Sequence, residues 1–421
     1  MLKTIRTIFA TATLRQSGIT FAGTIINGAL GAVFYILCAR ALGPASFGIM
    51  SVALAVAMLA ASIGDLGTDM GLVRFVSHYW KKDKPKAERF LKLTFKIKII
   101  AGLAISVAGI LLSDVIANQL FQKSELAESL RIGFLGVVIT LIYGFVVTSL
   151  KAFQKFFLWS AIQVGANLFR VLLILALFLL GAISVSASLW TYVLTLLVGF
   201  IIGMLFLMPK DFLFVKNEKS VGSELFHYNK WIASFTLVAA LSSRMDTFIS
   251  ARLLPPVEIG LYAAANQMVY IVPQIIGALG TVFAPKMAEM GKEKIINYLK
   301  KTQILVTGLA FLGIFSIPVV SYFVPIVFGK EYTASIPIFV VLLFAMLVFL
   351  IAVPAHNAIL FYYSKPSLFF WLALGHLAVM GILGWFLISN YGVMGGAFTV
   401  LIGSTFNFVI PAIWVVRKIR S

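Results

Sequence analysis

Charged residues are scarce in this chain. They make up 12% of its 421 residues, about half the share that is usual in soluble domains. Acidic residues are rarer than basic ones, with 15 Asp and Glu against 34 Lys and Arg. Because 61% of the residues are hydrophobic, a soluble globular protein of this composition would lack the polar surface that keeps it in solution. The composition therefore indicates an integral membrane protein.

Cysteine and the usual signatures of enzymes are also missing. The single cysteine, Cys38, excludes an intramolecular disulfide and a metal site built from several cysteines. The sequence contains no Walker A loop, no HExxH motif, no glycine-rich nucleotide loop and no Cys/His cluster. The longest polar connections, around 73–92 and 209–230, have about twenty residues, too few for a soluble catalytic domain. We expect neither an enzyme nor a resident metal or cofactor.

Long apolar runs dominate what is present. A membrane-spanning helix needs roughly 20 mostly apolar residues, and β-barrel strands would be shorter and alternating. The first run is too long for a signal peptide and has no cleavage site after it. We therefore predict an all-α integral membrane protein with twelve transmembrane helices, near 16–38, 47–72, 93–113, 130–150, 157–180, 187–208, 231–254, 261–284, 302–324, 335–356, 367–388 and 393–416.

Basic residues alternate between the connections of these runs. Of the 34 Lys and Arg, 27 lie in every second connection, and such basic connections usually stay in the cytoplasm. We therefore predict a multi-pass protein of the cell membrane with both termini cytoplasmic. The net charge of +19 is then mainly a topology signal, and nucleic acid is not an expected partner. The basic run 81–92 is compatible with anionic lipid headgroups or, more simply, with a solvated loop.

The two halves of the chain contain a repeat. Residues 39–48 and 251–260 both read Ala-Arg-x-Leu-x-Pro-x-x-x-Gly, 212 residues apart. This predicts two six-helix bundles of the same orientation, 1–208 and 231–421, joined by a cytoplasmic linker, 209–230. Parallel repeats of this kind form transporters with the substrate path at their interface. The motif also has a mechanical interpretation, in which Pro and Gly end helices and Arg40 and Arg252 snorkel to the outer interface.

Charges inside predicted spans are the best pointers to function. Each costs at least about 2.5–3.5 kcal/mol to insert, so it faces a cavity or a partner. Asp65 and Asp69 are one turn apart on one face of the second run, whereas Arg244 and Asp246 lie on roughly opposite faces of the seventh. Arg170 lies within the fifth run, and Arg74 at the end of the second. Structural ion pairs between helices would explain them, but Arg170 and Arg244 also favour an anionic ligand, because the planar guanidinium matches phosphate.

Uncharged polar residues complete the candidate set. We place Asn27, Asn167, Asn266 and Asn357 in a polar cavity. His356 and His376 are also within spans, and hydrogen bonds between helices are the simpler interpretation for both.

Several of these motifs together resemble a known family. They are residues 39–48, Asp65-Leu66-Gly67, Val73-Arg74-Phe75, Ser243-Arg244-x-Asp246 and Leu253-x-Pro255-x-x-x-Ile259-Gly260-Leu261-Tyr262. The chain resembles polysaccharide biosynthesis flippases of the multidrug/oligosaccharidyl-lipid/polysaccharide (MOP) exporter superfamily. The similarity covers the length, the number of spans and the repeat. It implies a V-shaped transporter, like multidrug and toxin extrusion (MATE) proteins, that moves a polyprenyl-diphosphate-linked oligosaccharide to the outer leaflet by alternating access.

The resemblance also implies roles for the candidate residues. Arg40, Arg74, Arg170 and Arg244 would line a cationic cavity for the substrate, while Asp65, Asp69 and Asp246 would bind a coupling ion, H⁺ or Na⁺, or hold the arginines. The further expected partners are membrane lipids and a polymerase or glycosyltransferases of the same pathway. Three alternatives remain: a MATE-type multidrug or cation antiporter, a lipid II flippase, which usually has two more spans, and a non-transporting membrane scaffold.

Overall fold

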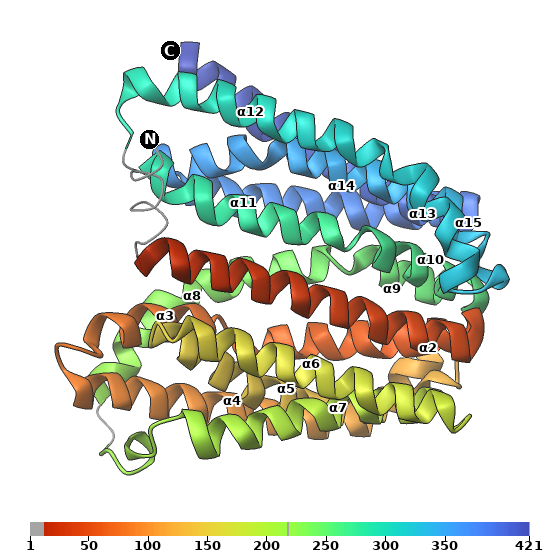
Figure 1. Cartoon of the computed structure of the whole chain (residues 1–421), viewed down its shortest axis with the longest axis horizontal. Coiled ribbons are helices and arrows are strands. Elements are labelled where there is room, and N and C mark those ends of the chain that lie inside the picture. The colour runs from red at the N-terminus through yellow and green to blue at the C-terminus, as the bar shows by residue number, and fades with distance from the viewer. Residues whose placement is uncertain (1–11, 217–218, 289, 421) are drawn as a thin grey trace. The chain divides into compact units, whose positions relative to one another are not determined.

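The fold is helical throughout the part of the chain that the structure describes. This computed structural model describes residues 12–216, 219–288 and 290–420 (Figure 1). No β-strand occurs among these residues. The predicted all-α class is therefore confirmed.

Six α-helices lie in the described part of the first half, residues 12–216, and most match predicted spans. Two π-helical turns, η1 (Ile116–Leu120) and η2 (Gly203–Leu207), continue α4 and α7, and a 3₁₀ turn, η3 (Asp211–Leu213), follows. α5 packs against both α4 and α7 (Figure 1). The helices are α2 (Ala12–Asp65), α3 (Thr68–Tyr79), α4 (Lys84–Val115), α5 (Leu126–Ala152), α6 (Phe156–Leu179) and α7 (Val185–Ile202).

The second half contains more breaks. α8 and α9 meet at a bend of 41°, and α12 and α13 at a bend of 42°, so two predicted spans are each a pair of shorter helices. α14 packs against α15, α10, α11 and α12. The elements are α8 (Lys219–Ser242), α9 (Met245–Leu253), α10 (Pro256–Val269), α11 (Ile271–Ala288), α12 (Lys292–Ile314), α13 (Ser316–Val327), η4 (Lys330–Tyr332), α14 (Ser335–Asn357), η5 (Ala358–Tyr362) and α15 (Pro366–Arg420).

Glycines break the two longest helices. Eight helices in the described part are long and apolar enough to cross a membrane, or ten when each bent pair counts as one span. Two of them, Thr20–Asp65 and Ser367–Arg420, have 46 and 54 residues, more than twice what one crossing needs. Gly43 (φ 69°, ψ 170°) and Gly392 (φ 58°, ψ −141°) interrupt them with backbone angles that glycine adopts readily. The count of twelve spans stays a prediction.

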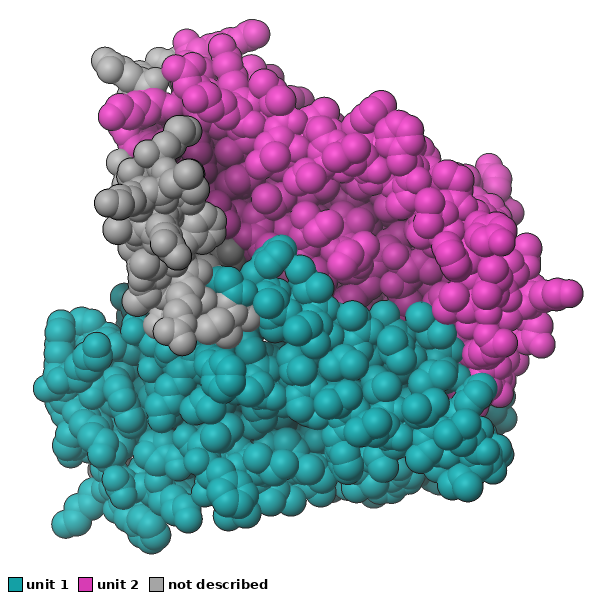
Figure 2. All heavy atoms as spheres, viewed as in Figure 1, with its two compact units in different colours: residues 1–38, 53–237 teal, residues 39–52, 238–421 magenta. Residues whose placement is uncertain are grey.

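The chain divides into two compact units (Figure 2). Unit 1 comprises residues 1–38 and 53–237, and unit 2 comprises residues 39–52 and 238–421. The middle of α2 therefore belongs to unit 2, and most of α8 belongs to unit 1. The boundaries of these units differ from those of the predicted bundles 1–208 and 231–421, which remain a prediction.

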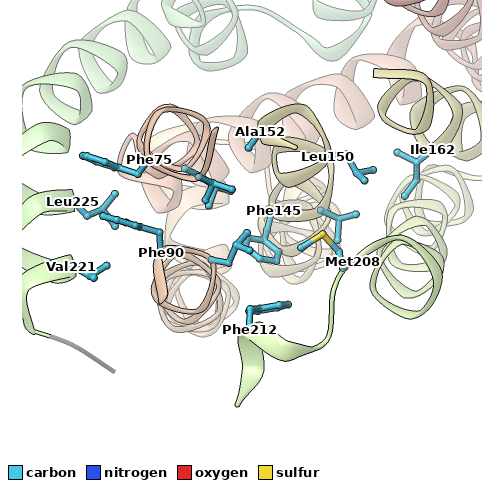
Figure 3. Close-up of a cluster of buried hydrophobic side chains, with 14 residues drawn as sticks. Phe75, Phe90, Phe145, Leu150, Ala152, Ile162, Met208, Phe212, Val221 and Leu225 are labelled. Atoms are coloured by element: carbon cyan, nitrogen blue, oxygen red, sulfur yellow. The ribbon is translucent and has the colours of Figure 1, made fainter. Parts of the chain in front are cut away.

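Part of the predicted linker 209–230 belongs to the core of unit 1. Phe212, Val221 and Leu225 are buried in one cluster with Phe90 and Phe145. Figure 3 shows Phe212 pointing from its turn toward Phe145, and the ring centroids are 5.7 Å apart. The segment was predicted as a polar connection because of its lysines, but its apolar side chains bury themselves between those lysines.

The two copies of the repeated motif contact each other within unit 2. Gly260 lies against the backbone of Pro44, and Gly48 lies against the backbone of Pro256. Proline and glycine hold the same motif positions in both copies, so the contact is reciprocal. No side chain fits between the copies at these two points.

Candidate functional site

Arg170 is the central residue of the candidate site in unit 1. Its side chain, on α6, is only 6% exposed. Its Nε donates a hydrogen bond to Thr195 Oγ1 on α7 at 3.2 Å, and its Nη1 donates to Asn167 Oδ1 at 2.8 Å. The guanidinium carbon lies 4.2 Å from the ring centroid of Tyr192 and 5.6 Å from that of Phe34, so aromatic faces also stabilise the cation.

Two predicted cavity asparagines orient this arginine. Asn167 accepts from Arg170 and donates through Nδ2 to Asn27 Oδ1 at 2.5 Å. The chain Asn27–Asn167–Arg170 thereby joins α2 to α6. The described partners of Arg170 are neutral, and no carboxylate of the described residues forms an ion pair with it. A buried charge without a counterion is costly, so an incoming anion would be stabilised here.

Asp65 and Asp69 lie on either side of a helix break. α2 ends at Asp65, Leu66 and Gly67 adopt positive φ angles of 51° and 69°, and α3 begins at Thr68. The prediction that one continuous helix carries both carboxylates on one face was therefore wrong. Glycine suits position 67 because its φ of 69° is strained for other residues, and a Cβ atom there would also lie 3.2 Å from the backbone nitrogen of Ala233.

Lys98 brings the two carboxylates together. Its Nζ lies 2.5 Å from Asp65 Oδ1 and 3.0 Å from Asp69 Oδ1, and its side chain is 1% exposed. Lys98 is one of the 27 basic residues that the alternation assigns to cytoplasmic connections, but it lies inside α4 and is buried. The sequence did indicate that Lys98 lies within a span, since position 98 is inside the apolar run 93–113. With one ammonium between two ionised carboxylates, the cluster has a formal charge of −1.

Asp246 has a different environment, in unit 2. It lies in the first turn of α9, is 6% exposed, and accepts a hydrogen bond from Tyr262 Oη at 2.5 Å. The Tyr262 hydroxyl also bonds the side chain of Asn266, so Asn266 joins this polar chain. Arg244 lies half-buried at the bend between α8 and α9. Because of this bend, Arg244 and Asp246 do not lie on one regular helix.

Three other predicted cavity residues have structural partners. Arg40 donates through Nη1 to the carbonyl oxygens of Ile326 at 2.6 Å and Val327 at 3.4 Å, where it caps the end of α13. Arg74 is exposed, with its guanidinium 4.3 Å from the ring centroid of Tyr228. Asn357 donates to Val353 in its own helix at 2.9 Å. These contacts favour the structural interpretation for all three.

The two histidines within predicted spans also have hydrogen-bond partners. His356 Nε2 lies 2.8 Å from the carbonyl oxygen of Asn407, and His376 Nδ1 lies 2.5 Å from Ser242 Oγ. Both contacts join different helices of unit 2. They agree with the simpler interpretation of these histidines.

Comparison with known proteins identifies the family. Residues 13–291 match the model of the family described as "Polysaccharide biosynthesis protein". The chain belongs to this family. Over 335 residues it is 23% identical to the lipopolysaccharide biosynthesis protein WzxC of Escherichia coli (strain K12), a match that covers 75% of this chain. The match spans 63% of the length of WzxC.

Solved structures of MOP-superfamily transporters share the fold of this family member. An inward-facing multidrug resistance MATE transporter of that superfamily matches 96% of this chain and 98% of its own, with a TM-score of 0.78 and 12% identity. The lipid II flippase MurJ in an inward closed conformation matches 94% of this chain and 87% of its own, with a TM-score of 0.77 and 13% identity. The chain is thus a multi-span helical membrane protein with a transporter fold.

Proposed function

We propose that this chain is a flippase that carries a polyprenyl-diphosphate-linked oligosaccharide from the cytoplasmic to the outer leaflet of the cell membrane. It would cross the membrane twelve times as two six-helix bundles, with both termini in the cytoplasm, and work by alternating access. The observation that carries the proposal is Arg170, a buried guanidinium whose described partners are all neutral. Family membership and the similarity to WzxC support the substrate class.

The diphosphate supplies the anion that this arginine lacks. Nε and one proton of Nη1 are occupied by Thr195 and Asn167, which fixes the plane of the guanidinium. The remaining donors can then bind phosphate oxygens without first losing side-chain freedom. Tyr192 and Phe34 lower the exposure of the site to water, which strengthens the attraction.

The acidic residues provide a way to couple transport to an ion. Asp65 and Asp69 share Lys98, so one negative charge of the cluster stays uncompensated and can take up H⁺ or Na⁺. Asp246 is a second candidate, since the hydrogen bonds described for its carboxylate come from neutral groups, the Tyr262 hydroxyl and backbone amides. Glycosyltransferases that build the glycan and a polymerase that extends it would act before and after this transport step.

A transport assay with matched variants tests the proposal. The full chain is reconstituted into liposomes, and movement of a labelled polyprenyl-diphosphate glycan between leaflets is measured. Arg170→Gln should lower the rate at least tenfold, whereas Arg170→Lys should retain part of it. Arg131→Gln is the control, because Arg131 is exposed and paired with Asp114 at 2.6 Å. If the wild-type chain exchanged organic cations but did not move the glycan, the result would favour the MATE-type alternative and contradict the proposal.

A further inference from the structure

One face of α4 changes from basic to apolar along its length. Ile100, Leu103, Val107 and Leu111 are each half or more exposed, and their spacing of three and four places them on one face. This apolar stripe is about 16 Å long at 1.5 Å per residue. Lys96 and Lys92 continue the same face one and two turns earlier. A helix of this pattern passes from a headgroup region into hydrocarbon.

A short turn is attached to the basic end of α4. Phe212 of η3 is fully buried and packs against Phe95 with ring centroids 5.9 Å apart; Figure 3 shows the turn that carries it. Nearby, Lys92 Nζ donates to the carbonyl oxygen of Val215 at 2.6 Å. Lys216 is exposed and directly follows Val215, so this hydrogen bond keeps Lys216 near Lys92.

The lysines gathered here lack acidic partners within the described residues. No carboxylate in that part of the chain forms an ion pair with Lys92, Lys96 or Lys216. Asp211, on the same turn, pairs with Lys84 at 3.5 Å instead. Lysines on one helix face and on the turn bound to it, without counterions in the described residues, favour the binding of an anion.

Apolar side chains project from the same turn. Phe214 is 84% exposed and Leu213 is 40% exposed. Their neighbour Phe212, in contrast, is fully buried. Exposed apolar side chains next to lysines are typical of segments that lie in the membrane interface. An anion that also offers an acyl chain fits this surface better than a free ion does.

We propose that Lys92, Lys96, Lys216 and Phe214 form a binding site for an anionic phospholipid. The ammonium groups bind the phosphate of the headgroup, and an acyl chain follows the stripe from Ile100 to Leu111. Phe214 and Leu213 enter the boundary between headgroups and acyl chains. The site lies wholly in unit 1, shares no residue with Arg170 and its partners, and does not depend on the proposed transport function.

Retention of lipid by the purified full chain tests the site. Native mass spectrometry measures bound phosphatidylglycerol and phosphatidylcholine after extraction. Lys96→Gln/Lys216→Gln should lower retained phosphatidylglycerol at least fivefold and leave phosphatidylcholine unchanged, and Lys96→Arg/Lys216→Arg should retain it. Phe214→Ser, which changes no charge, should lower it about twofold to threefold. Thermal unfolding of each variant in the same detergent verifies that it is folded.

A control variant distinguishes a specific lipid site from a general attraction of anionic lipid to the positively charged protein. Lys81 and Lys82 are both exposed in the connection before α4, so Lys81→Gln/Lys82→Gln removes the same charge elsewhere. Equal losses in the two double variants would overturn the proposal, as would no loss in Lys96→Gln/Lys216→Gln. Inorganic phosphate without lipid provides the third arm. Stabilisation by millimolar phosphate alone, removed by the same lysine substitutions, would identify a free-anion site instead of a lipid site.

Discussion

Gly260 lies against the backbone of Pro44 so closely that a Cβ atom at position 260 would overlap the proline carbonyl. Gly48 has the same relationship to Pro256. The two copies of the motif at 39–48 and 251–260 therefore form one joint, through which the middle of α2 is held in unit 2. Backbone on both sides leaves no flexible side chain that could move away.

Alanine at this joint should be strongly destabilising. We expect Gly260→Ala and Gly48→Ala each to cost about 1–3 kcal/mol or more, because over-packing must here move backbone. Gly308→Ala is the matched control, since a Cβ atom there meets nothing within 4 Å and helix propensity favours alanine. Thermal unfolding of the purified variants is the measurement. Similar melting temperatures for Gly260→Ala and Gly308→Ala would contradict the close contact.

Removal of Lys98 should be costly because two carboxylates would lose their cation. We expect Lys98→Met to destabilise the chain by about 3 kcal/mol, the lower end for a broken buried pair, since both carboxylates are partly exposed. The triple variant Lys98→Met/Asp65→Asn/Asp69→Asn should regain most of this loss, because no uncompensated charge is left. Equal unfolding temperatures of the single and triple variants would show that the three charges do not interact.

The asparagines beside Arg170 should affect binding more than stability. Asn167→Ala removes the bond to Nη1 and the link to Asn27, so the guanidinium loses its fixed orientation. We expect about tenfold weaker binding of the polyprenyl-diphosphate glycan, which corresponds to about 1.4 kcal/mol. The control Asn390→Ala removes an exposed asparagine whose described hydrogen bond, at 2.7 Å, is to Phe386 of its own helix. Unchanged affinity in Asn167→Ala would exclude an orienting role.

Tyr262 should stabilise unit 2 through its bond to Asp246. Tyr262→Phe leaves the buried carboxylate without its hydroxyl donor, at an expected cost of about 1–3 kcal/mol. Tyr322→Phe, at an exposed tyrosine, should have no measurable effect on the melting temperature. A second substitution, Asp246→Asn, should make the loss of the Tyr262 hydroxyl less costly, because the charge is gone. Additive effects of the two substitutions would argue against their coupling.

The candidate residues differ in how far they could be predicted. Arg170, Asn167 and Asn27 stand out in apolar runs, but Asn27 and Asn167 are 140 residues apart in the sequence, which gives no indication that the three form one chain of hydrogen bonds. Lys98 closely follows the basic run 81–92, so the charge pattern alone does not separate it from the lysines of a connection. Arg40 stands in the first copy of the repeated motif, yet its hydrogen bonds go to carbonyls 286 and 287 residues away.

The helical class and the approximate position of most membrane spans follow from the sequence by itself. Hydropathy is a local property, and a backbone in lipid must satisfy its hydrogen bonds within each helix. The partners of the few polar groups were decided only by the tertiary structure. Lys98 reaches Asp65 and Asp69 across a helix break, and the glycine of each repeat lies against the proline of the other. Such contacts depend on how helices pack, which no local pattern of residues specifies.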